Sequence, residues 1–226
     1  MATENVLQEA NIREEKRAMK IVGGGSLAQG FVATGAIALA IIGLAAFQTF
    51  WMAAIATILA GTALMFEGAA IATRFSTLMH DTDAGRLGTI ELGAGMTAEM
   101  LGGVAGLALG ILSLAGLVPM VLMPVAAIVY GVTLVLGLGA TARLNDLHIE
   151  KVCDSNESRH VARALVKSAE GVQILFGLGS VALGILAIVG MTPVILSMVA
   201  MLAVGFSSML SGSAIGGRVL SSLHCA

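Results

Sequence analysis

Three glutamates stand inside or at the edges of long apolar stretches of this 226-residue chain. Glu67 comes seven positions before Arg74, the first charge after its stretch, which places it about 10 Å inward along a helix. Glu99 and Glu170 stand at the starts of two later apolar stretches. A carboxylate within a bilayer is costly unless something neutralises or pairs it. The sequence therefore predicts a shallow proton or cation site made of Glu67, Glu99 and Glu170, with Gln173 as a candidate fourth oxygen.

The same glutamates also have a structural interpretation. A carboxylate near the N-terminus of a helix interacts favourably with the helix dipole, which would account for Glu99 and Glu170. Glu67 would then pair with a neighbouring hydroxyl group or arginine. On this interpretation the three side chains serve the fold and bind no ion.

Other groupings of chemically reactive side chains match no known type of site. His148, Glu150, Cys153 and His160 have none of the usual zinc spacings and are expected in an exposed loop. His80, Asp81 and Asp83 are expected in a loop or turn. Met120 and Met123 resemble a copper-binding pair, but thioethers fill irregular apolar packing equally well. Cys153 and Cys225 are expected to be free thiols. We therefore predict no metal site and no cofactor.

Signatures of enzymes are also missing from the sequence. It has no phosphate-binding loop, no nucleophile elbow and no histidine within an apolar stretch that could bind haem. The prediction is a protein without enzymatic activity.

The composition is that of an integral membrane protein. Hydrophobic residues make up 57% of the chain and charged residues 12%, against about 25% in globular domains, and the mean hydropathy is +0.95. The apolar stretch of residues 101–144 is long enough to cross a bilayer, turn at 118–124 and cross back. Two similar stretches flank it. The predicted fold is all-α, with six transmembrane helices arranged as three helical hairpins.

The hairpins are predicted to be repeats of one another. At an offset of 74 residues, five Gly or Pro positions of the second hairpin match those of the third: Gly103, Gly110, Gly116, Pro119 and Gly131 match Gly177, Gly184, Gly190, Pro193 and Gly205. The predicted organisation is an amphipathic N-terminal segment (1–21), a membrane domain (22–217) and a tail (218–226). Its hairpins are 22–73, 96–142 and 171–217, and its polar connections are 74–95 and 143–170.

The distribution of basic residues predicts the orientation. All twelve lysines and arginines lie in the N-terminal segment, in the two polar connections or just after the second, fourth and sixth spans. By the positive-inside rule, both termini and both connections are cytoplasmic. The predicted location is the inner (plasma) membrane, crossed several times.

Two kinds of pattern predict contacts. Small residues at every fourth position indicate close helix packing, which we expect within the chain rather than between chains; they are Gly102, Gly106 and Gly110, and Ser208, Gly212 and Gly216. Basic stripes are expected to contact anionic lipid headgroups or an acidic partner, or only to fix topology; they are Arg13, Lys16, Arg17 and Lys20, and Arg159, Arg163 and Lys167. Neither pattern suggests nucleic acid.

The repeated hairpins resemble the HdeD-like membrane proteins. The residues that carry the resemblance are Gly110, Pro119, Gly131 and Arg143, and Gly184, Pro193, Gly205 and Arg218. The first hairpin departs from the pattern because it lacks the turn proline. The resemblance implies a bacterial inner-membrane protein, linked to acid stress in one member and otherwise of undefined biochemistry.

Two functions follow as hypotheses. The first is a structural or assembly role, in which the protein self-associates or accompanies a larger membrane complex. The alternative is a small channel or transporter that uses the carboxylate site at its cytoplasmic side.

Overall fold

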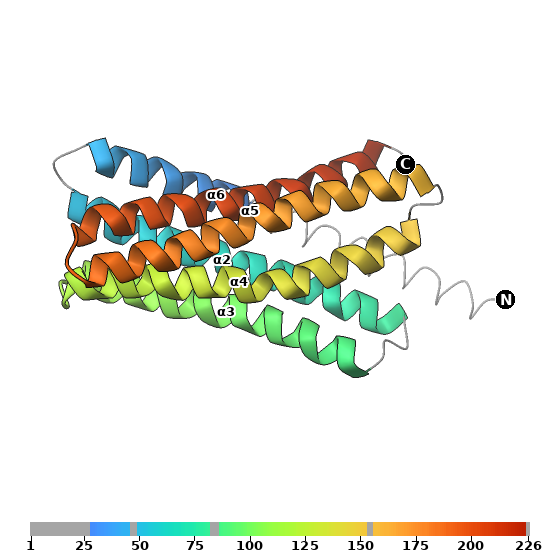
Figure 1. Ribbon diagram of the computed structural model, residues 1–226, viewed down its shortest axis with the longest axis horizontal. Coiled ribbons are helices and arrows are strands. Elements are labelled where there is room, and N and C mark those ends of the chain that lie inside the picture. Colours follow the sequence, from blue (N-terminus) through green and yellow to red (C-terminus); the bar gives the residue numbers. More distant parts are fainter. Residues whose placement is uncertain (1–27, 46–48, 82–85, 153–155, 225–226) are drawn as a thin grey trace, which may run out of the picture.

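The structure is a computed structural model that describes residues 28–45, 49–81, 86–152 and 156–224. Side chains are described for 28–45, 50–72, 97–138 and 171–211. Apart from short turns, all of the described backbone is helical (Figure 1). The predicted segment 1–21, Asp83, Cys153 and Cys225 lie outside it.

Six helices within these ranges are long and apolar enough to cross a membrane. They are the first helix (Ala28–Ala45), α2 (Thr49–Asp81), α3 (Arg86–Leu114), α4 (Pro119–Val152), α5 (Asn156–Ile188) and α6 (Pro193–His224). Each contains an uncharged or nearly uncharged window of 18 to 23 residues. For the described residues, the prediction of an all-α protein is confirmed, with six helices long and apolar enough to span a membrane.

The helices continue beyond their apolar windows, which corrects the predicted loops. α2 runs to Asp81 and α4 to Val152, so His80, Asp81, His148 and Glu150 are helical. His160 likewise lies within α5. The physical reason is that residues 74–81 and 143–152 contain no Gly or Pro, and polar side chains alone do not end a helix.

The turns between α3 and α4 and between α5 and α6 have the same backbone geometry. Gly116 and Gly190 have positive φ angles of 84° and 100°, and a proline begins the helix three residues later in both turns. The N–H of Gly116 donates to Ser113 O at 3.0 Å, and the N–H of Gly190 donates to Ala187 O at 3.1 Å. A glycine in the left-handed region followed by a proline at the next helix start is a favourable way to end one helix and begin another.

The turn between α3 and α4 is shorter than the sequence predicts. The apolar pattern predicts a turn at residues 118–124, but α4 already begins at Pro119 and Pro124 lies inside the helix. Its ring is tolerated because it falls in the second turn of α4, close to the N-terminus, where one lost backbone hydrogen bond disturbs little of the helix.

Because only glycine adopts these φ angles without strain, we expect Gly116→Ala or Gly190→Ala to lower the free energy of unfolding by about 1–2 kcal/mol. The midpoint of thermal unfolding in detergent measures the effect. Gly171→Ala is the matched control, since nothing lies within 4 Å of the added Cβ and its φ is not positive. Equal midpoints for the three variants would contradict the prediction.

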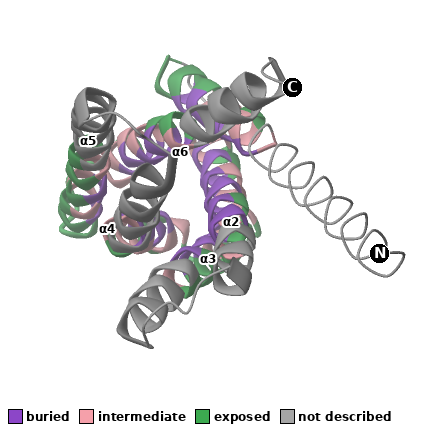
Figure 2. Ribbon diagram, turned by 90° about the vertical axis from the view of Figure 1, so that its right-hand side faces the viewer, coloured by how far each residue is buried: buried purple, intermediate pink, exposed green. Residues whose placement is uncertain are grey.

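Three helices form the inside of the bundle and three lie around it. In α2, α4 and α6, 61%, 56% and 44% of the apolar window is buried, compared with 33%, 28% and 22% in the first helix, α3 and α5. The three inner helices contact one another, and Figure 2 shows their buried surfaces turned toward the centre. The outer helices present exposed apolar side chains suited to lipid.

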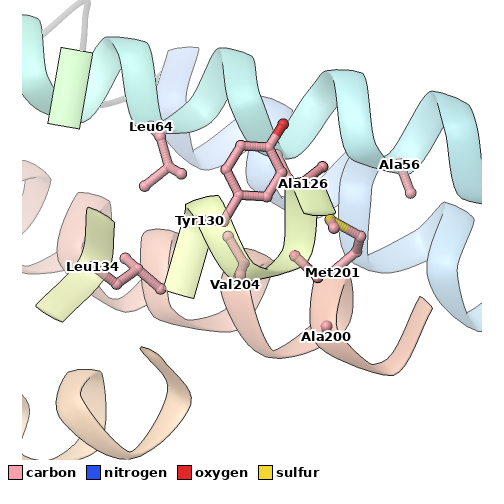
Figure 3. Close-up of a cluster of buried hydrophobic side chains, with 10 residues drawn as sticks. Ala56, Leu64, Ala126, Tyr130, Leu134, Ala200, Met201 and Val204 are labelled. Carbon is pink, nitrogen blue, oxygen red and sulfur yellow. The ribbon is translucent and has the colours of Figure 1, made fainter. Parts of the chain in front are cut away.

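Alanines bring the inner helices close together around one tyrosine. Figure 3 shows Tyr130 of α4 between Leu64 of α2 and Val204 of α6, with alanines of all three helices around them. The Tyr130 hydroxyl donates to Thr57 O of α2 at 2.7 Å. Nearer the turns, a second cluster containing Met123 and Met198 fills the space. The centre is therefore packed with apolar side chains from the level of Leu64 to the turns.

The glycines of α3 are used for contacts within the chain. A Cβ on Gly102 would overlap Thr133, and one on Gly106 would overlap the Tyr130 ring, both on α4. A Cβ on Gly110 would lie 2.8 Å from Ile58 of α2. Ser208 of α6 is buried as well, whereas the side-chain surroundings of Gly212 and Gly216 lie outside the description. The stripe on α3 thus packs inside the bundle.

Candidate functional site

Two of the three predicted glutamates come together inside the bundle. Glu67 of α2 and Glu99 of α3 are 2% and 0% exposed, and their carboxyl groups interact electrostatically. Both lie at the end of the bundle opposite the turns, which we call the carboxylate end. The side chain of Glu170 lies outside the described residues. Gln173 of α5 is partly buried, and its amide nitrogen has no hydrogen-bond partner.

Polar residues of α6 line the α2 side of the site. The Ser211 and Ser208 side chains, one turn apart, both lie beside the Glu67 carboxyl group. The Ser208 hydroxyl group itself has no well-formed hydrogen bond. A helix crossing that presents two hydroxyl groups to one carboxylate can stabilise it without a basic residue.

The first helix contributes Gln29 to the same region. Its side-chain nitrogen Nε2 donates to the backbone oxygen of Ser208 at 3.1 Å, and the side chain is fully buried. The other end of the amide, Oε1, accepts no hydrogen bond. The hydrogen bond therefore fixes Gln29 at the turn of α6 that lies against Glu67. It leaves the buried side-chain oxygen Oε1 without a hydrogen-bond partner.

Glycines make room for Glu99. A Cβ on Gly137 of α4 would overlap the carboxyl group of Glu99, so the carboxyl group lies against the bare backbone of α4. Gly68 of α2 lets α3 approach closely at the same position, with its hypothetical Cβ 2.9 Å from Met100 N and 3.3 Å from the Cβ of Glu99. The glutamate is thus held between α2 and α4 because both helices lack a side chain there.

The described side chains of the site carry two carboxyl groups and several oxygen atoms without hydrogen-bond partners. Among the residues whose side chains are described, Glu67 and Glu99 are the only charged ones. Five buried oxygens of the region have no hydrogen-bond partner: Gln29 Oε1, Glu67 Oε2, Glu99 Oε1 and Oε2, and Ser208 Oγ. Buried polar atoms are nearly always paired in folded proteins. The arrangement can therefore accept protons or a cation.

The remaining sequence candidates do not form sites in the described part. Met120 is 55% exposed while Met123 is buried, so the two thioethers do not act as a pair. No three His, Cys, Asp or Glu side chains come together there in the manner of a metal centre. The basic stripe of residues 13–20 and the side chains of Arg159, Arg163 and Lys167 fall outside the description.

Sequence reasoning missed Gln29 and Ser211, and it assigned Ser208 only to packing. No signal in the sequence singles out Ser211, because serines are common in the apolar stretches and none of its neighbours is charged before Arg218.

No protein-family model, no curated protein and no solved structure matches this chain. The assignment of a function therefore depends on the geometry of the carboxylate end.

Proposed function

We propose that this chain is a small channel or transporter for protons or cations, with its ion site at Glu67 and Glu99. The observation that supports the proposal is the burial of two carboxyl groups together, with no basic side chain among the described residues to pair with them. Ionisable residues at such positions in membrane proteins usually belong to ion or proton pathways. The proposal involves no enzymatic step.

Several finer features belong to the same proposal. We place the protein in the inner (plasma) membrane with both termini in the cytoplasm, which makes the carboxylate end the cytoplasmic end. The matching turns at Gly116 and Gly190 support the interpretation of the last two hairpins as repeats. Membership of the HdeD-like family rests on the glycine and proline pattern alone.

The structural or assembly role remains a second prediction. The glycines of α3 give it less support than the sequence suggested, because their close contacts are made with α2 and α4 of the same chain. Self-association or a place in a larger complex would use the outer helices. The mass of the particle purified in mild detergent tests this prediction directly.

Flux measurements test the transport proposal. In proteoliposomes with an imposed cation or pH gradient, Glu67→Gln is expected to reduce flux to the level of empty vesicles, because the amide cannot carry the charge that binds the ion. Ser197→Ala is the control, since Ser197 is a buried, unpaired serine of α6 near the turns. Wild-type flux in the Glu67 variant, or equal loss in both variants, would contradict the proposal.

A further inference from the structure

We propose that the carboxylate end binds one divalent cation, coordinated through oxygen atoms by Glu67 and Glu99 with Ser208 and Gln29 as neutral donors. The inference rests on the proposed function, because it names the ligand of the same site. It is supported by the chemistry of the unpaired atoms, by the charge of the site and by the space made for Glu99.

The donor set consists of oxygen. All five unpaired atoms are carboxylate, hydroxyl or amide oxygens, and they come from the first helix, α2, α3 and α6. The nitrogen of Gln29 is already engaged with the Ser208 backbone, so only its oxygen is left to coordinate. Oxygen-only sites suit Mg²⁺, Ca²⁺ and Mn²⁺, and Ca²⁺ and Mn²⁺ tolerate the loss of bound water better than Mg²⁺ does.

The charge of the site selects a divalent over a monovalent cation. Two carboxylates carry two negative charges, and the described spans contain no Lys or Arg to offset them. In a medium of low dielectric constant, a net charge is strongly unfavourable. One divalent cation makes the site neutral, whereas one monovalent cation would leave a negative charge.

Protonation of both glutamates would also give a neutral pair, and it is the competing outcome. The number of acceptors argues against it: each proton is shared by two oxygens at most, whereas a cation that takes six to eight oxygen ligands has room for all five unpaired oxygens. A cation therefore accounts for more of the buried oxygens than protons do.

Gly137 positions one of the ligands. Because a Cβ at this position would overlap the Glu99 carboxyl group, Gly137→Ala would displace that group while leaving its charge in place. Gly137 is a positioning residue, and its alanine variant separates the geometry of the site from its charge.

The test measures binding to the purified full-length protein in mild detergent. Titration calorimetry with Ca²⁺, and the electron paramagnetic resonance of Mn²⁺, are expected to show one site per chain. Glu67→Gln and Glu99→Gln are each expected to weaken binding by roughly tenfold to a hundredfold, and Gly137→Ala by a smaller factor. Ser197→Ala is expected to bind as the unmodified protein does. Thermal unfolding of each variant verifies that it is folded.

Absence of binding would overturn the inference, as would binding that the two glutamate variants leave unchanged. Protonated glutamates at neutral pH would overturn it too; they would appear as an infrared carboxylic acid band that Glu99→Gln removes. Proton flux without divalent binding would refute this inference but leave the proposed function standing. Divalent binding without any flux would refute the proposed function but leave the divalent site standing. The two failures are thus distinguishable.

Discussion

Gly106→Leu is expected to prevent the protein from forming a stable bundle. A Cβ at this position would overlap the ring of Tyr130, and the leucine side chain would add three further carbon atoms to the same space. Tyr130 cannot retreat, because it is fully buried and its hydroxyl group is bonded to α2. Overpacking of this kind in a core costs about 3 kcal/mol or more.

The measurement is the fraction of protein that remains monodisperse in detergent after heating, compared with the unmodified chain. Gly179→Leu is the matched control, because nothing lies within 4 Å of a Cβ added to this glycine of α5. If Gly106 instead served contacts between chains, the variant would lose its oligomers with an unchanged monomer stability. That result would contradict the packing seen here.

Tyr130→Ala is expected to lower the free energy of unfolding by about 3–5 kcal/mol, as other aromatic-to-alanine changes in cores do. The ring fills the space between the three inner helices, and alanines around it are too small to collapse into the cavity. Tyr130→Phe keeps the ring and loses only the hydrogen bond to Thr57 O, for about 1 kcal/mol.

Unfolding in detergent with increasing denaturant gives both values, with the phenylalanine variant as the internal control. If the alanine and phenylalanine variants lost equal stability, the hydrogen bond rather than the ring would be the main contribution. That result would contradict the role assigned to the ring.

The helical fold was predictable because apolar length is a strong and local signal. Six windows of about twenty apolar residues leave few alternatives in a chain of this length. The loops are harder to predict, because the polar residues around His80 and His148 suggest irregular structure without requiring it. Helix hydrogen bonding continues through polar residues wherever glycine and proline are absent, so the helices extend to Asp81 and Val152.

The candidate site was only partly predictable. Glu67 stood out because a charge inside an apolar stretch is rare, and its pairing with Glu99 followed from their similar depth. Gln29 gave no such signal, because a neutral amide near the start of a hydrophobic helix is common. Its importance comes from the contact with Ser208, 179 residues away along the chain. Contacts between distant residues depend on how the helices rotate about their axes, which sequence periodicity does not determine.

The apolar filling between the carboxylate end and the turns has a consequence for exchange with the two compartments. Among the described side chains, Leu64, Tyr130, Met123 and Met198 fill much of the axis between Glu67 and the turns. An ion at the glutamates would therefore equilibrate with one compartment alone, and its occupancy would follow the concentration on that side. Translocation would need a second conformation in which the Tyr130 ring leaves the axis, so the frequency of that ring movement would set the upper limit of turnover.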